Sequence, residues 1–188
     1  MSLRPACHVL LVVLLAAAPA LPGHAALSAP LALPTGCDTF SWDVSRELAA
    51  LSGTPEPVSA GAGGVDGGPR IALETLYQVR LLPQAEVTLA ARPGKPMLDD
   101  DARAGLLMFQ VPADGRYRVS ITTGHWIDVV DDGRIIASLD FQGRRGCALV
   151  HKIVEFQLPA GRDLVLQFAG GAAEASGVVI TAVANPPE

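Results

Sequence analysis

From Leu76 onward, apolar and polar residues alternate with a period of two in short segments separated by Gly, Pro and Asp. Such alternation is typical of antiparallel strands that bury one face and expose the other. Nine segments of this kind are expected to be strands, at residues 77–82, 86–90, 106–111, 116–122, 125–130, 134–139, 150–158, 164–168 and 178–183. The pattern predicts a mostly β fold, an antiparallel β-sandwich or jelly roll, rather than a parallel α/β fold.

A helical periodicity precedes the alternating region. Phe40, Val44, Leu48 and Leu51 recur at helical spacing, and a glycine and a proline follow directly. One short N-terminal helix is therefore predicted at about residues 40–52.

The remaining segments set the expected domain boundaries. Residues 54–70 are rich in Gly, Pro, Ala and Ser and have no periodicity, which predicts a flexible linker. The N-terminal segment would then cover residues 26–70, the β-sandwich domain residues 71–184, and a tail residues 185–188.

The strongest local signal is the pair Asp132-Gly133, which readily adopts the positive φ angles of a type I′ turn. It predicts a hairpin in which Asp131 faces Arg134. Extending that register places Ile127 opposite Ser138, Trp126 opposite Leu139, and His125 opposite Asp140. One face of the hairpin would then lie in the core and carry Trp126, Val130, Ile135, Ala137 and Leu139.

The first 25 residues predict a cleavable signal peptide. Arg4 precedes an unbroken apolar run, and Gly23-His24-Ala25 offers the small residues that a signal peptidase reads. The apolar stretch at residues 9–21 is 13 residues long, whereas a membrane-spanning helix needs roughly 20. We therefore expect a mature protein that begins at Ala26, has no transmembrane segment, and is periplasmic or secreted.

Two cysteines remain when Cys7 leaves with the signal peptide. Cys37 and Cys147 are expected to form a disulfide, because cysteines of exported chains usually pair. The alternatives are two buried free thiols, or a lipid attached to Cys37, although that residue lies well beyond the apolar run.

Charge narrows the range of partners. Removing the signal peptide leaves 163 of the 188 residues and changes the net charge from −5 to −6, because the removed part has one basic residue and no acid. An acidic chain without a basic patch argues against a nucleic-acid partner.

Two resemblances follow from particular motifs. Residues 109–119 (FQVPADGRYRV) and 158–166 (LPAGRDLVL) resemble bacterial pre-peptidase C-terminal and carbohydrate-binding β-sandwich modules, which implies a fold but no function. Cys37, residues 124–128 (GHWID), Cys147 and the LPAG motif are similar to those of a group of small exported bacterial proteins. Some of that group are labelled homogentisate dioxygenases, which implies an iron site of two histidines and a carboxylate.

The candidate ligands of such a site are His125 and His151, with Asp140 or Glu155 as the acid. In one continuous strand, however, the Cα atoms of His151 and Glu155 would lie roughly 13 Å apart, too far to share an ion easily. We therefore treat these four residues as a candidate polar site and predict no bound metal or cofactor. A carboxylate beside His125 would raise the pKa of its imidazole.

Other motifs predict structure rather than chemistry. The acidic run at residues 99–101 lacks the alternating spacing of an EF-hand loop and is expected to be a solvated loop. Trp42 and Trp126 could stack on a sugar, but with only 5% aromatic residues the chain lacks the exposed aromatic row of sugar-binding modules, so both are expected to be core residues.

Taken together, these features predict an exported, non-enzymatic binding or interaction module of the cell envelope. Its partner would be an envelope protein, a glycan or a small ligand. The alternative is a metal-dependent, dioxygenase-like enzyme that uses His125 and His151.

Overall fold

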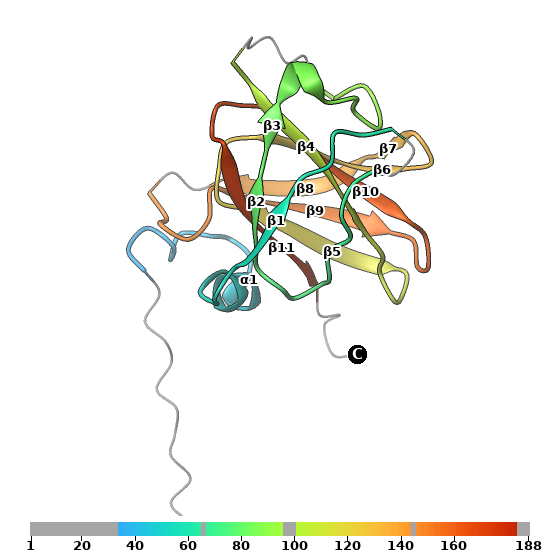
Figure 1. Cartoon of the computed structure of the whole chain (residues 1–188). Helices are drawn as coiled ribbons and strands as arrows, with labels where there is room; N and C mark the ends of the chain where they lie inside the picture. The colour runs from blue at the N-terminus through green and yellow to red at the C-terminus, as the bar shows by residue number, and fades with distance from the viewer. Residues whose placement is uncertain (1–33, 65–66, 96–100, 144–145, 184–188) are drawn as a thin grey trace, which may run out of the picture. The chain divides into compact units, whose positions relative to one another are not determined.

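The computed structural model describes residues 34–64, 67–95, 101–143 and 146–183. The predicted signal peptide with its cleavage site, the acids Asp99 and Asp100, and the tail at 185–188 lie outside these residues. The described part forms eleven strands in two sheets with one short α-helix, which confirms the predicted mostly β sandwich (Figure 1).

The two sheets alternate along the chain, so neighbours in space are mostly distant in sequence. The larger sheet contains, in spatial order, β1 (Glu56–Ser59), β2 (Tyr77–Arg80), β11 (Ala175–Ala182), β5 (Gly115–Ile121), β9 (Lys152–Leu158) and β8 (Ser138–Gly143). The smaller sheet contains β3 (Leu82–Pro83), β4 (Arg103–Phe109), β10 (Leu164–Gly171), β6 (Trp126–Asp131) and β7 (Arg134–Ile136). Strands β1 and β2 are parallel, and the other pairs are antiparallel.

The main core lies between the two sheets. On β5, Tyr117, Val119 and Ile121 enter it, as the alternation at residues 116–122 predicts. The intervening polar residues are not solvated, however: Arg118 and Ser120 are buried on the outer face of the larger sheet. Period-two alternation shows which side chains share a face but not what covers that face.

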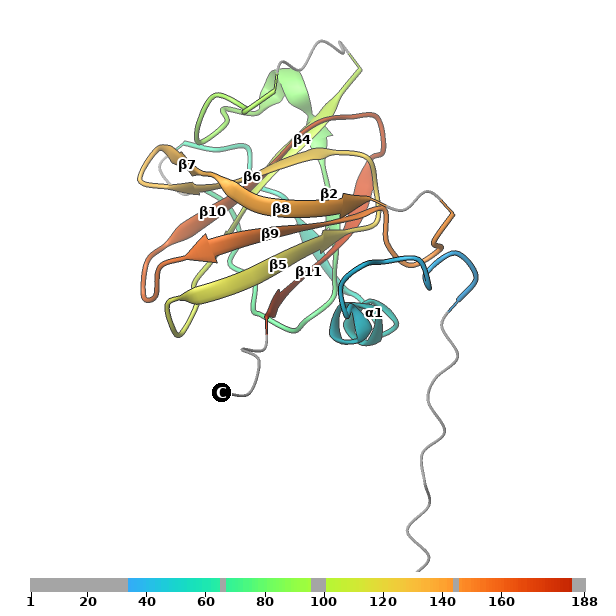
Figure 2. The same ribbon diagram turned by 180° about the vertical axis from the view of Figure 1, so that it is seen from behind.

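That outer face is covered by α1 (Ser45–Leu51), which is shorter than the predicted helix (Figure 2). Its Leu48 and Leu51 pack with Ile153 of β9 and Val179 of β11 in a second apolar cluster. The helix begins late because the Asp43 side chain accepts a hydrogen bond from the Ser45 N–H (3.0 Å) and forms a turn there.

The predicted disulfide is confirmed, since Cys37 and Cys147 are bonded and their Cα atoms lie 4.6 Å apart. Cys37 belongs to the apolar cluster beneath α1. The bond therefore ties the segment that precedes α1 to the connection between β8 and β9.

The predicted turn at Asp132-Gly133 is also confirmed. Both residues have positive φ, 48° and 73°, and Asp131 pairs with Arg134. The pairing extends only to Val129 opposite Ile136, after which the chain leaves the smaller sheet and enters the larger one as β8.

The rest of the predicted hairpin register is therefore wrong. Ser138 pairs with Phe156 and Asp140 with Glu155, both on β9, so neither Ser138 nor Asp140 pairs with β6. The predicted core face is wrong as well, because Ile127 and Val129 enter the main core while Leu139 is 54% exposed.

Two further segments differ from the sequence-based predictions. Residues 86–90 form no strand: a 3-10 turn (Gln84–Glu86) precedes them, and the Thr88 N–H donates a single hydrogen bond to the Ala62 carbonyl. The predicted linker at 54–70 contains β1, which pairs with β2, because its extended backbone reaches an otherwise unpaired sheet edge.

Candidate functional site

The candidate site is a cavity of about 320 Å³ at one open edge of the sandwich, between β6 of the smaller sheet and β8 and β9 of the larger one. We call it the edge cavity. Strand β10 pairs with β6 along one side, and β7 pairs on the other side only with residues 129–131. Residues 126–128 therefore have no strand on that second side in the described part of the chain, and the cavity lies there. The chain crosses this gap at Ala137, and the crossing forms one wall.

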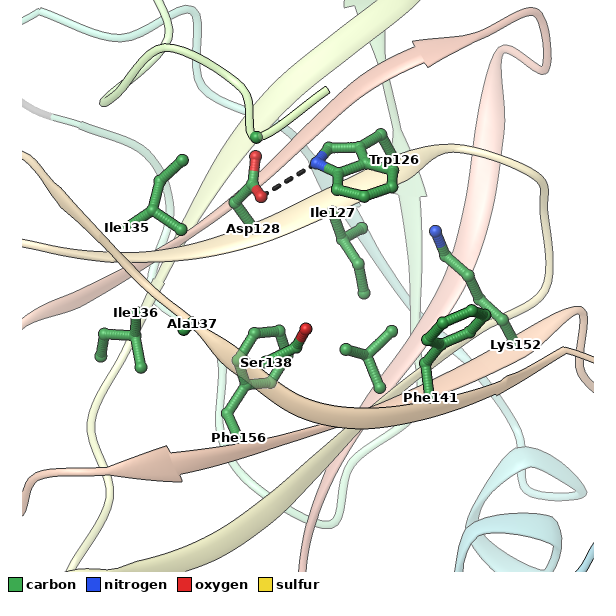
Figure 3. Close-up of a pocket in the computed structure, with 12 residues that line it drawn as sticks. Trp126, Ile127, Asp128, Ile135, Ile136, Ala137, Ser138, Phe141, Lys152 and Phe156 are labelled. Atoms are coloured by element: carbon green, nitrogen blue, oxygen red, sulfur yellow. Dashed lines mark hydrogen bonds between the residues drawn. The ribbon is translucent and has the colours of Figure 1, made fainter. Parts of the chain in front are cut away.

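Most of the cavity wall is apolar and continuous with the main core. Ile127 of β6 and Phe156 of β9 form its floor, and both also belong to the core cluster. Ile136 closes the side formed by β7. Figure 3 shows Ile127 pointing into the space between the two sheets, with Phe156 facing it from the other side.

The mouth of the cavity is formed by β8. Two large hydrophobic side chains of this strand are exposed to solvent: Leu139 is 54% exposed and Phe141 is 66% exposed. Phe141 pairs with Val154 of β9 and lines the cavity. Phe141 faces the space between the sheets, but no strand that the structure describes in the smaller sheet covers it there. The apolar surface of the cavity therefore continues onto an exposed rim.

One cation lies inside this apolar space. Lys152, at the start of β9, lines the cavity, and its Nζ lies 5.4 Å from the centroid of the Trp126 ring (Figure 3). No carboxylate of the described residues lies within 4.0 Å of this ammonium. A cation–π contact with an indole is one of the few favourable contacts that an ammonium has in such a place.

The surroundings lower the pKa of Lys152 to about 8. Burial, which disfavours the charged amine, is the main cause, and Lys95 adds like-charge repulsion, whereas the Asp128 carboxylate acts in the opposite direction. At pH 7 the side chain still carries its proton in most molecules.

Asp128 is the buried carboxylate of the site, and both of its oxygens are already occupied. Oδ1 accepts a hydrogen bond from Trp126 Nε1 (2.9 Å), and Oδ2 accepts one from Gln167 Nε2 (3.0 Å). Gln167 also bonds both backbone groups of Ala91. Asp128 therefore fixes the Trp126 ring at the cavity edge and joins it to the loop that carries Gly94.

Two larger hollows are weaker candidates. One, of about 480 Å³, lies over β1 and β2 and is lined by exposed strand residues such as Ser59 and Gln78. The other, of about 390 Å³, lies beside α1, where Arg118 and Glu47 already pair with each other. Neither combines an unpaired buried charge with a wall that reaches the core.

His125, from the predicted polar site, lies elsewhere and is fully buried. Its Nδ1 is 2.7 Å from Thr123 Oγ1, and its ring meets Phe168 edge to face, with 6.2 Å between the ring centroids. The ring packs so closely on Gly171 that a Cβ at that glycine would lie 2.5 Å from it. Nε2 has no hydrogen-bond partner in the described part of the chain.

The predicted effect on the His125 pKa is wrong in direction. Burial lowers this pKa, the Gly171 backbone opposes that effect, and the Lys152 ammonium lowers the pKa further. Asp140, the partner expected from the hairpin register, lies on β8 in the other sheet.

The three other predicted residues lie in different environments. Asp140 is exposed, and its Oδ1 accepts a hydrogen bond from the Phe141 N–H. His151 is exposed at the entry to β9. Glu155 is buried and pairs with Arg116 (3.1 Å) and Arg118 (2.9 Å) on the outer face of the larger sheet. In the described residues, no group of three or more His, Cys, Asp or Glu side chains is arranged to hold a metal ion.

Sequence reasoning missed Lys152, Asp128 and Phe141 as site residues. A signal was present for Lys152: it has the same strand parity as Val154, Phe156 and Leu158, three core residues. A lysine that shares the strand face of buried apolar residues is predicted to direct its side chain toward the core.

The position of Lys152 leads to a prediction. Lys95 and Lys152 are the two lysines of the sequence, so NMR of lysine-labelled protein gives only two side-chain titration curves. We expect Lys152 to titrate near pH 8. Replacing Asp128 by Asn removes the charge that favours the ammonium and should lower this pKa, whereas Lys95→Met removes the repulsion and should raise it. An unperturbed pKa near 10.4 for Lys152 would contradict this description of the cavity.

None of the described helices is both long and apolar enough to cross a membrane. No family model matches this sequence, and no curated protein or solved structure is significantly similar to it. The resemblance to pre-peptidase C-terminal, carbohydrate-binding and dioxygenase-labelled proteins therefore stays a prediction.

Proposed function

We propose that this protein is an exported, non-enzymatic binding module of the cell envelope that holds a small, largely apolar ligand in the edge cavity. The observation that carries the proposal is the cavity itself, whose apolar walls come from both sheets and continue onto the exposed Phe141. Pockets for small molecules are mostly apolar with a few polar groups, and their volumes begin near 300 Å³.

Two features support export to the periplasm or beyond. The Cys37–Cys147 disulfide suits an oxidising compartment, since cytosolic thiols are kept reduced. The N-terminal apolar run has the order of a signal peptide. Of the partners expected from the sequence, a cavity of only about 320 Å³ favours a small ligand over a protein or an extended glycan.

The neutral fluorescent probe N-phenyl-1-naphthylamine tests the binding function, because its emission rises when it leaves water. We expect the mature protein to bind it, and Ser138→Phe, which places a ring at the cavity wall, to weaken binding at least tenfold. Ser59→Phe is the matched control, because Ser59 is an exposed strand serine at the opposite edge of the same sheet. Absence of binding, or equal binding by both variants, would disprove the proposal.

A further inference from the structure

The edge cavity carries a positive charge that the described residues of its walls do not neutralise. Lys152 Nζ lies among apolar side chains, and among the described residues this ammonium contacts the face of Trp126 and has no carboxylate within 4.0 Å. A half-buried ammonium without a counterion has lost water without gaining a partner of opposite charge. The site is therefore incomplete in electrostatic terms.

Within the described residues, the charged and titratable groups around Lys152 do not supply that partner. The charge of Asp128 acts on Lys152, but both oxygens of that carboxylate are held by Trp126 and Gln167. Lys95, from the loop beside β6, adds a second positive charge, and His125 is a buried base on which Lys152 acts repulsively. The neighbouring His151 is a further base, exposed at the entry to β9.

The apolar part of the cavity limits what the anion can be. Ile127, Val154 and Phe156 would contact any group that extends inward from Lys152, and Phe141 would contact one that extends outward. A fully hydrated inorganic anion would leave these surfaces unfilled. A volume of about 320 Å³ lies at the lower end for small-molecule sites, which suits a ligand of roughly ten to fifteen non-hydrogen atoms.

We propose that the edge cavity binds a small amphiphilic carboxylate, with the carboxylate on Lys152 and the apolar body against Phe156, Ile127 and Phe141. This inference rests on the proposed binding function and adds the chemical class of the ligand. The carboxylate would complete the charge pairing, and the body would cover the apolar wall that opens at β8.

Three eight-carbon probes with different head groups test the charge requirement: octanoate, octan-1-ol and octylammonium. Binding at pH 7 can be followed by the fluorescence of Trp126 in a Trp42→Phe background, since the chain has two tryptophans. Hydrogen bonds to charged groups exceed neutral ones enough to give octanoate a roughly 10- to 100-fold advantage over octanol. Octylammonium should bind more weakly than either.

Lys152→Met keeps most of the length of the side chain and removes its charge. We expect this variant to bind octanol as the parent does and to lose the preference for octanoate. Arg134→Met is the matched control, because Arg134 is an exposed cation on β7 that does not line the cavity. That control should keep the full preference.

The possible results separate this inference from the proposed function. Equal affinity for octanoate and octanol, a preference for octylammonium, or a preference that survives Lys152→Met would overturn the carboxylate assignment. Binding of the naphthylamine probe without binding of octanoate would overturn it too, while the binding function stands. If neither the naphthylamine probe nor any octyl compound binds, both proposals fail.

Discussion

Replacing Arg118 with methionine is expected to lower the free energy of unfolding by about 3–5 kcal/mol, because it leaves the buried Glu47 without its cationic partner and Glu155 with Arg116 alone. Arg118 donates hydrogen bonds to Glu155 (2.9 Å) and Glu47 (3.4 Å), and its guanidinium lies 4.5 Å from the Trp42 ring centroid. Glu47, on α1, is 2% exposed. Without Arg118, Glu47 keeps a hydrogen bond from the Thr181 hydroxyl, which carries no charge.

Urea denaturation of three variants checks this result. In Arg118→Met with Glu47→Gln, the neutral amide removes one uncompensated charge, so part of the lost stability should return. Arg46→Met is the control: Arg46 also forms an ion pair from α1, with Glu74, but the two side chains are 51% and 38% exposed. Exposed pairs contribute at most about 1 kcal/mol. If Arg118→Met and Arg46→Met were equally mild, the buried network would not be what holds α1 to the sheet.

Loss of the Cys37–Cys147 disulfide is expected to cost about 2–5 kcal/mol of unfolding free energy. The two cysteines are 110 positions apart, so the bond removes much of the conformational freedom of the unfolded chain. The double variant Cys37→Ala/Cys147→Ala also removes the buried Cys37 sulfur from the cluster beneath α1. This lost packing adds to the effect.

Guanidinium denaturation of the double variant and of the reduced parent protein separates these two contributions. The reduced parent keeps both sulfur atoms and loses only the bond, so it should be destabilised somewhat less than the double variant. A parent protein whose unfolding midpoint does not change on complete reduction would show that the bond contributes nothing to stability.

The predictions that succeeded depend on local chemistry. Asp132-Gly133 specifies its turn because only a few residue types tolerate positive φ at both positions. Cys37 and Cys147 paired as expected because they are the two cysteines that follow the predicted signal peptide, so only one pairing between them is open. The mostly β fold followed from the period-two alternation along most of the chain.

The predictions that failed depend on which strands become neighbours. The sequence pattern predicts one strand at residues 134–139, but the chain passes from one sheet to the other at Ala137. No local pattern of residues indicates such a change of sheet. The predicted pair His125 and Asp140 was lost with that register. The edge cavity is lined by residues of β6, β8 and β9, which are brought together only by the fold. Of its polar residues, only Lys152 could have been found from the sequence, because it shares the strand face of core residues on β9.

The sheet change at Ala137 has a consequence for the energetics of ligand binding. Residues 134–143 belong to both sheets, and they also form a wall of the edge cavity. A bound ligand would therefore contact the whole sandwich rather than a separately moving loop, and its binding free energy would add to the global stability. At a ligand concentration one hundred times the Kd, that linkage amounts to about 2.7 kcal/mol. Ligand supply would then set how long the folded protein persists in an environment where unfolded chains are degraded.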